Sequence, residues 1–116
     1  MSDSIRELTE AILRFRDERD WQQFHNPKDM AAAISIEAGE LLEQFLWKTP
    51  PEAEERLSTH RGEIQDEVAD IGIYLIELAD NLGIDLGEAI LQKMEKNAQK
   101  YPVEKAKGKH TKYTEL

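Results

Sequence analysis

The sequence predicts an all-α bundle, and three observations carry this prediction. Apolar residues recur every three or four positions in four separate segments, which is the spacing of an amphipathic helix. No segment alternates apolar and polar residues convincingly, as a half-buried strand would. Short connections with proline, glycine or asparagine separate the segments, so that consecutive helices can pack antiparallel. A chain of 116 residues has the length of one domain with a modest core.

The first predicted helix covers residues 4–20. Ser2 or Ser4 can serve as its N-cap, because a short hydroxyl side chain accepts a hydrogen bond from a free amide of the first turn. The charged segment 14–20 is expected to mark the outer end of the helix. The core stripe of this helix consists of Ile5, Leu8, Ile12 and Phe15.

The connection after this helix is unusual, because it contains two aromatic residues and a histidine, Trp21, Phe24 and His25. The aromatic rings can stack on a nucleobase, or they can form a hydrophobic plug over the end of the bundle. Both interpretations stay open. We expect His25 to be a capping or surface residue.

Residues 27–47 form the second predicted helix. Asn26 caps it, and Pro27 occupies the first position, where a missing N–H does no harm. The helix ends before Pro50 and Pro51, because a proline ring clashes with the preceding turn. Its apolar ridge consists of Ile34, Ala38, Leu41 and Phe45, with Leu42 and Leu46 beside it.

A short helical turn over residues 51–57 precedes the third long helix, which is predicted over residues 59–82. Gly83 follows as a left-handed terminator. Asp85 then caps a fourth helix over residues 86–100. The ridge of the third helix is Ile64, Val68, Ile71 and Leu75, and the fourth helix is expected to turn Leu86, Ala89, Ile90 and Met94 inward.

These elements predict a helical domain over residues 1–102 and a lysine-rich, extended tail over residues 103–116, whose last five residues we expect to dock. The segment from Lys93 to Lys112 holds seven lysines and two glutamates, although the net charge of the chain is −9. An acidic chain lacks the basic footprint of a general nucleic-acid-binding protein. An acidic body with a basic end can hold a cation and a polyphosphate together, and the alternative is a solvated tail.

Cysteine is absent, which excludes disulfides and thiolate metal sites and is consistent with a reducing cytoplasm. No apolar run reaches the length of a transmembrane helix. The polar N-terminus lacks the apolar region of a secretory signal. We therefore expect a cytoplasmic protein that does not bind membranes.

Two pairs of carboxylates predict a metal site. Glu37 and Glu40 belong to the second helix, and Glu67 and Asp70 lie 30 residues later in the third. Each pair has i, i+3 spacing, so its members are neighbours on one helical face. Both pairs lie on the same side of their apolar ridges, and two antiparallel helices packed by these ridges bring the pairs to a common rim. Four converging carboxylates repel one another unless a cation lies between them. Hard oxygen ligands favour Mg²⁺, with Mn²⁺ possible, and the alternative is that all four are surface acids.

Other residues can complete a nucleotide site. Glu63 lies one turn before Glu67 and can be a further ligand or a base that orients water. Tyr74 follows Asp70 by one turn and is expected beside the metal site. The candidates for a phosphate-binding face are Lys93, Asn97, Lys100 and Tyr101, and the candidates for base binding are Trp21, Trp47 and Tyr74. The alternative for the lysines is a solvated helical face.

The sequence resembles the all-α nucleoside triphosphate pyrophosphohydrolases of the MazG-like family, whose pattern E-x-x-E, spacer, E-x-x-D is matched by the two carboxylate pairs. Further segments resemble the dCTP pyrophosphatase branch of this family, and the resemblance covers nearly the whole chain. These segments are Arg19-Asp20-Trp21-x-x-Phe24-His25-x-Pro27, Gly39-Glu40-Leu41, Trp47-Lys48, Lys93-Met94, Tyr101-Pro102 and Lys112-Tyr113-Thr114-Glu115-Leu116.

The resemblance implies a four-helix-bundle-type fold and hydrolysis of a nucleoside triphosphate between its α- and β-phosphates. The products would be a nucleoside monophosphate and pyrophosphate, and the substrate would be dCTP or a modified dCTP, in house-cleaning of the nucleotide pool. Mg²⁺ held by the four carboxylates would bridge phosphate oxygens and help to place the attacking water, with Glu40 and Glu63 as the candidate catalytic residues. Lys93, Asn97, Lys100 and Tyr101 would hold the triphosphate or sugar, and Trp21, Trp47 and Tyr74 would line the base pocket. The family also implies a homo-dimer or homo-tetramer with sites near subunit interfaces.

One position departs from the family pattern and leaves the choice of base open. Animal members carry a histidine at the position of Ile12, and an aliphatic side chain there removes a polar contact. Two alternatives to a dCTP pyrophosphatase therefore stay open. The same fold can act on another nucleotide, such as dUTP or a phosphoribosyl-nucleotide. The chain can also be a non-enzymatic helical interaction module, with its aromatic residues in a protein interface.

Overall fold

The computed structural model describes residues 4–116, which contain helices and no strand. The predicted all-α class is therefore confirmed. The helices form two compact units that divide between Ile84 and Asp85. Among the described residues, none of the helices combines the length and the apolar character needed to cross a membrane. The α-helices are α1 (Ile5–Glu18), α2 (Pro27–Glu43), α3 (Pro50–Thr59), α4 (Arg61–Asn81), α5 (Leu86–Lys100) and α6 (Val103–Ala106), and the 3-10 turns are η1 (Gln22–Phe24) and η2 (Tyr113–Glu115).

The helix ends follow the predicted capping residues. Asn26 and Asp85 each accept a hydrogen bond from the backbone N–H three residues later, at 3.0 and 3.1 Å. Ser4 does the same at 3.2 Å, whereas Ser2, the other candidate for this cap, lies outside the described residues. Gly83 has a φ of 67°, which is the left-handed conformation expected after a helix.

The end of α2 differs from the prediction. The helix stops at Glu43 and continues as a turn up to Trp47, whose φ of 62° is an unusual conformation for a bulky residue. Thr49 then caps α3 through a capping box, in which side chain and backbone satisfy each other's amides. Because of this cap, α3 begins at Pro50 and is longer than the predicted turn.

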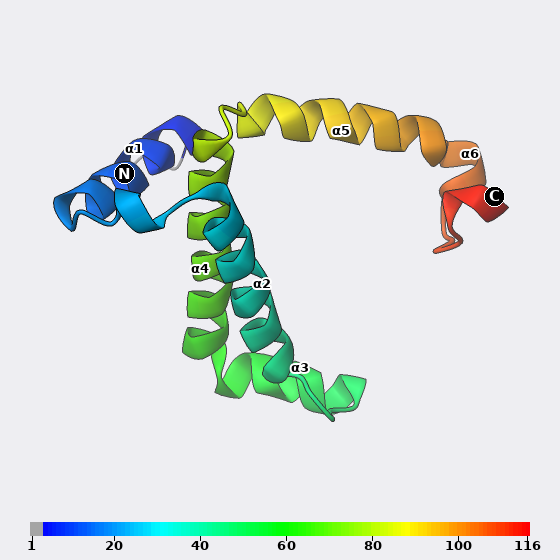
Figure 1. Ribbon diagram of the computed structural model, residues 1–116. Helices are drawn as coiled ribbons and strands as arrows, with labels where there is room; N and C mark the ends of the chain where they lie inside the picture. The colour runs from blue at the N-terminus through cyan, green and yellow to red at the C-terminus, as the bar shows by residue number, and fades with distance from the viewer. Residues whose placement is uncertain (1–3) are drawn as a thin grey trace. The chain divides into compact units, whose positions relative to one another are not determined.

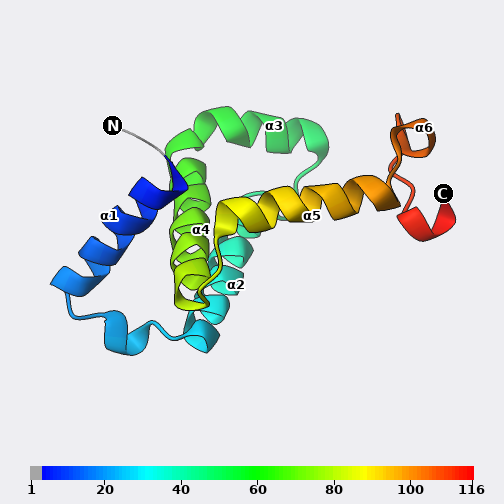
Figure 2. The same ribbon diagram turned by 90° about the horizontal axis from the view of Figure 1, so that it is seen from above.

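The first unit is organised around α4, which contacts α1, α2 and α3. Helices α2 and α4 lie side by side and antiparallel, as predicted (Figures 1 and 2). Met30 of α2 and Ile64 and Ala79 of α4 are the buried hydrophobic residues of this unit. Met30 was not among the predicted core residues.

The predicted apolar ridges are only partly covered. Val68 and Leu75 of α4 are 54% and 42% exposed, and Leu42 of α2 is 65% exposed. Helical periodicity identifies the apolar face of a helix, but it does not tell how many neighbouring elements cover that face. A wide apolar surface of the first unit therefore stays open to solvent in the single chain.

In the second unit, the C-terminal residues fold back on the end of α5. The predicted extended tail is wrong, because α6 and η2 follow α5. The rings of Tyr101 and Tyr113 pack edge to face with their centroids 5.9 Å apart, and Lys100 Nζ lies 4.8 Å from the Tyr113 ring centroid. These aromatic and cation–π contacts confirm that the last residues dock. Ile90 and Met94, which were predicted to point inward, are exposed.

Candidate active site

Three of the predicted metal ligands meet between α2 and α4. Carboxylate oxygens of Glu37, Glu67 and Asp70 lie within 4.8 Å of one another. Glu37 Oε2 and Glu67 Oε2 are buried, and no hydrogen-bond donor among the described residues contacts either oxygen. Buried carboxylate oxygens without a partner are costly. Hard oxygens that converge in this way fit a cation such as Mg²⁺. We call these three residues the acid group.

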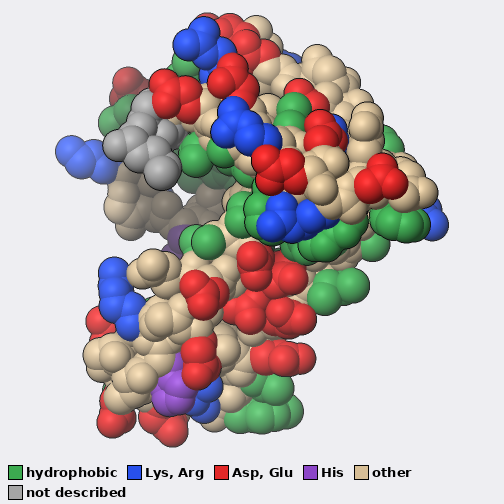
Figure 3. Space-filling model, turned by 90° about the vertical axis from the view of Figure 1, so that its left-hand side faces the viewer, with side chains coloured by type: hydrophobic (Ala, Val, Ile, Leu, Met, Phe, Trp, Pro, Cys, Tyr) green, Lys and Arg blue, Asp and Glu red, His purple; other side chains and the backbone are tan. Residues whose placement is uncertain are grey.

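Glu40 and Glu63, the candidate catalytic residues, lie close to the acid group in sequence. Glu40 is not one of the three, but its charge helps to raise the pKa of both Glu37 and Glu67. Glu63 belongs to the first turn of α4 and is exposed. Figure 3 shows that Asp and Glu side chains gather on one face of the molecule, with hydrophobic side chains among them.

Glu37 and Glu67 of the acid group retain protons at a higher pH than ordinary glutamates do. Burial, followed by the Glu67 and Glu40 carboxyl groups, raises the pKa of Glu37 to about 7. The pKa of Glu67 is raised as well. A hydrogen bond from the protonated Glu37 carboxyl to the Glu67 carboxylate lowers the pKa of Glu67. Burial and the charges of Glu40 and Asp70 raise this pKa and outweigh the hydrogen bond. In the metal-free protein, Glu37 therefore keeps its proton up to nearly neutral pH.

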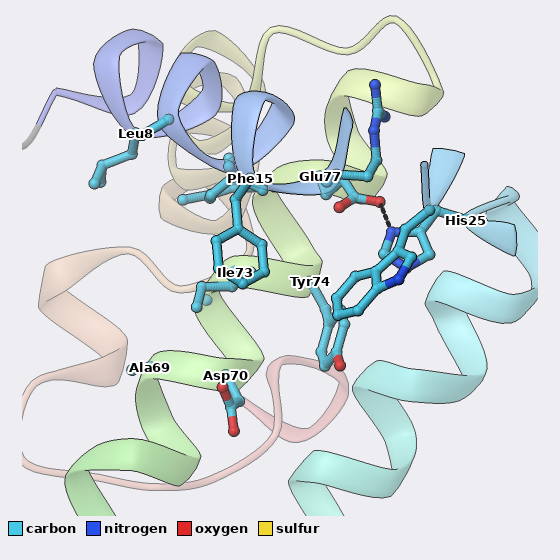
Figure 4. A pocket seen from close by; sticks show the side chains of 14 residues that line it. Leu8, Phe15, His25, Ala69, Asp70, Ile73, Tyr74 and Glu77 are labelled. Atoms are coloured by element: carbon cyan, nitrogen blue, oxygen red, sulfur yellow. Dashed lines mark hydrogen bonds and ion pairs between the residues drawn. The ribbon is translucent and has the colours of Figure 1, made fainter. Parts of the chain in front are cut away.

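A cavity of about 600 Å³ lies between α1, the connection after α1, and α4 (Figure 4). Asp70 of the acid group lines this cavity, and so do His25 and Glu77. In Figure 4, Tyr74 lies between Asp70 and the His25–Glu77 pair. An apolar cavity with a few convergent polar groups is the usual form of a small-molecule site. The apolar walls come mainly from Leu8, Ala11, Ile12, Phe15, Ile73 and Ile76.

Two of the three base-binding candidates line this cavity. Trp21 packs edge to face on Phe15, with ring centroids 6.0 Å apart. Tyr74 lies beside the acid group, as expected: burial, and then the charges of Glu37 and Asp70, raise its pKa. Trp47, in contrast, is 92% exposed and does not line the cavity of its own chain.

His25 is not the surface or capping residue that we expected. It is half-buried, and its Nδ1 lies 2.7 Å from Glu77 Oε2. Asn81 Nδ2 also donates a hydrogen bond of 2.9 Å to the His25 carbonyl oxygen. Glu77, which is 2% exposed, was not among the predicted site residues. Glu77 lies seven residues after Asp70 and therefore on the same face of an apolar helix segment. This spacing could have identified it as a second acid beside the site.

Arg16 is a second correction. The charged segment 14–20 was expected to mark the outer end of the first helix, but Arg16 is buried and lines the cavity. Its Nε donates a hydrogen bond of 2.8 Å to Asp17 Oδ1. The long aliphatic stem of arginine can cover apolar surface while its charged end finds a partner.

The phosphate-binding candidates belong to the second unit. Lys93 Nζ donates a hydrogen bond of 3.0 Å to Asn97 Oδ1 on the next turn of α5. Lys100 lies over Tyr113, which packs against Tyr101. All four candidates are exposed, and their role with phosphate stays a prediction.

An all-helical chain with an acid group at one end of an apolar cavity is typical of a metal-dependent enzyme that acts on a small molecule. Residues 32–116 match the MazG-like family, and the chain belongs to this family. It is 38% identical over 115 residues to dCTP pyrophosphatase 1 of Mus musculus and to that of Homo sapiens. Each alignment covers 97% of this chain and 68% of the relative. The chain is also similar to the crystal structure of a pyrophosphatase from Archaeoglobus fulgidus DSM 4304, with a TM-score of 0.82 and 44% identity over 88% of this chain and 95% of that chain.

The thermal stability of the metal-free protein is expected to fall as the pH rises from about 5 to about 8. The unfolded chain releases the Glu37 proton near the ordinary glutamate pKa, whereas the folded chain holds it up to a pKa of about 7. The stability that Glu37 contributes is thus fully present below the pKa that this carboxyl has in the unfolded chain. It is lost as the pH rises through the pKa that the same carboxyl has in the folded chain. Thermal unfolding with EDTA, followed by circular dichroism, measures this trend.

The substitution Glu37→Gln is expected to remove most of this pH dependence. Glu54→Gln, on the exposed side of α3, is the matched control and should keep the wild-type trend. A wild-type midpoint that stays constant or increases over this pH range contradicts the prediction.

Proposed function

We propose that this protein is a Mg²⁺-dependent nucleoside triphosphate pyrophosphohydrolase. It cleaves its substrate between the α- and β-phosphates and gives a nucleoside monophosphate and pyrophosphate. The substrate we propose is dCTP or a modified dCTP, so that the protein removes unwanted nucleotides from the pool. The observation that carries this proposal is the acid group at one end of an apolar cavity, in a chain of the MazG-like family.

The chain supplies a set of hard oxygen donors for the metal ion. Glu37, Glu67 and Asp70 would hold Mg²⁺, together with Glu40, and Mn²⁺ suits the same donors. The two buried oxygens without a partner, on Glu37 and Glu67, support this assignment. When bound, such an ion neutralises charge that develops on the phosphates and lowers the pKa of a bound water.

The remaining site residues act on the substrate directly. Glu40 and Glu63 are the groups that can orient the attacking water, and Trp21 and Tyr74 offer flat faces on which a base can stack. The cations and donors of α5 and its C-cap would hold the triphosphate or sugar; they are Lys93, Asn97, Lys100 and Tyr101.

We also propose that the protein is a homo-dimer or homo-tetramer. The ridge residues Val68 and Leu75, and Leu42 beside the other ridge, are exposed apolar side chains, and large exposed apolar patches commonly mark interfaces. Trp47 is 92% exposed and holds a left-handed conformation, which costs about 1–3 kcal/mol for a non-glycine residue. A second copy would cover this surface, and Trp47 would then serve the base site of that copy.

The alternatives have weaker support. The relatives named dCTP pyrophosphatase 1 favour dCTP over dUTP or a phosphoribosyl-nucleotide. A non-enzymatic interaction module gives no reason for buried, unpartnered carboxylate oxygens beside an apolar cavity. A location in the cytoplasm stays a prediction.

Pyrophosphate release from dCTP is expected to require Mg²⁺ and to fall about a hundredfold or more in Asp70→Asn and Glu40→Gln, because each removes a charge that holds the ion. The assay compares dCTP, dUTP and a phosphoribosyl-nucleotide with Mg²⁺ and with EDTA. Glu54→Gln is again the control and should retain wild-type activity. If folded Asp70→Asn keeps full activity, the metal assignment is wrong. If no substrate in the panel releases pyrophosphate from the wild-type protein, the reaction is wrong.

The mass of the protein in solution is expected to be two or four times the chain mass of 13.4 kDa, because a second copy covers the apolar ridges. Light scattering after size exclusion measures this mass. Leu42→Glu should shift it towards the monomer, whereas Lys28→Glu, whose side chain is 86% exposed, should leave it unchanged. A monomeric wild-type protein would overturn the proposed assembly.

A further inference from the structure

We propose that Glu77 is the hydrogen-bond acceptor that selects an amino-bearing pyrimidine, cytosine or its derivatives, over uracil and thymine. This inference rests on the proposed function for the presence of a nucleotide, and it assigns the choice of base to one side chain. The observations that carry it are the burial of Glu77, the way it is held, its open oxygen and its place in the cavity.

Glu77 is a buried carboxylate in a cavity with apolar walls. It is 2% exposed and lies on α4. A buried carboxylate costs free energy unless it is paired and hydrogen-bonded. The core of a small helical unit does not require such a group, because an apolar residue of similar size fits a helix interface at lower cost.

Glu77 is held in one orientation by residues from the connection before α2. His25 Nδ1 lies 2.7 Å from Glu77 Oε2. Asn81, one turn after Glu77, donates to the backbone carbonyl of His25 at 2.9 Å. Two contacts therefore join His25 to α4, and they fix the carboxylate that His25 contacts. A preorganised acceptor discriminates between ligands better than a mobile one, because it does not turn away from the wrong partner.

The other carboxylate oxygen of Glu77 is open. Oε1 has no hydrogen-bond partner among residues 4–116, although Glu77 lines the cavity. An ionised carboxylate only accepts hydrogen bonds. The ligand that satisfies Oε1 must therefore present an N–H or O–H group.

The place of Glu77 relative to the acid group fits a nucleotide. Asp70 and Glu77 are seven residues apart on one helix, which is about two turns or ~10 Å along the axis. Tyr74 lies between them in Figure 4, and the charges of Asp70 and Glu77 both raise its pKa. A nucleotide whose phosphates lie near Asp70 can thus place its base along Tyr74 and the outer edge of that base at Glu77.

The chemistry of the base edge then decides which pyrimidine binds. Cytosine presents an exocyclic amino group, which donates to a carboxylate. Uracil and thymine present a carbonyl oxygen at the same position, which repels it. Ile12, on another wall of the cavity, offers no polar atom, so Glu77 supplies the polar contact that the aliphatic residue lacks. A site built to satisfy a buried polar group rejects a ligand that leaves the group unpaired.

The first test measures binding of nucleoside monophosphates to the wild-type protein by calorimetry, so that no turnover is needed. We expect dCMP to bind about ten- to a hundredfold more tightly than dUMP, the range for one hydrogen bond to a charged group. A derivative of dCMP with two methyl groups on the exocyclic nitrogen keeps the ring but lacks the donor. It should bind as weakly as dUMP, while the monomethyl derivative keeps one donor and should bind more tightly. Equal binding of dCMP and dUMP overturns the assignment.

The second test uses two variants, one on each side of the His25–Glu77 contact. In Glu77→Gln the side chain both donates and accepts, so the preference for dCMP over dUMP should fall about tenfold or more. In His25→Gln the carboxylate remains, so the preference should persist even if both affinities fall. The alternative is that Glu77 only holds the connection before α2 against α4. Both variants would then lose thermal stability and both would keep the wild-type preference for dCMP over dUMP, which contradicts the proposal.

The assignment of Glu77 and the proposed reaction can fail separately. Selective binding of dCMP without pyrophosphate release from dCTP overturns the proposed reaction and supports the role of Glu77. Pyrophosphate release from dCTP and dUTP at equal kcat/KM, with equal binding of both monophosphates, supports the reaction and overturns the role of Glu77.

Discussion

The repulsion between the carboxylates of Glu37, Glu67 and Asp70 is the constraint on which the rest of the site depends. The antiparallel packing of α2 and α4 brings these side chains within 4.8 Å of one another. Like charges at such distances in a partly buried site cannot all be ionised without a large cost. The structure reduces this cost with a raised pKa for Glu37 and Glu67, and a divalent cation would remove it by taking the place of the proton.

Helix α4 arranges the remaining functional groups in order along one face. Asp70, Tyr74 and Glu77 follow one another at intervals of about one turn, so one member of the acid group, an aromatic ring and a second acid line one cavity. Helix α1 and the connection that contains Trp21 and His25 close the opposite side. In the proposed function, this one helix would provide a metal ligand, a surface for stacking and an acceptor for a base.

Local geometry explains how much of this could be predicted from the sequence. The long helices and their caps depend on periodicity and on local capping chemistry, and these predictions are confirmed. Antiparallel packing of the second and third predicted helices brings three of the four carboxylates together, namely Glu37, Glu67 and Asp70. The role of His25 could not be predicted, because its partner Glu77 lies 52 residues away. The burial of Arg16 and the exposure of Val68 depend on which elements cover each face, and the pattern of one helix does not contain this information.

We expect a cation to displace a proton from the acid group when it binds. Calorimetric titration of the protein with Mg²⁺ near pH 6.5, in two buffers with different heats of ionisation, measures how many protons leave on binding. We expect the release of about one proton in the wild-type protein, because metal ligands must be deprotonated, and much less in Glu37→Gln. Saturable binding of Mg²⁺ without release of a proton, or equal release in both proteins, would contradict this view of the site.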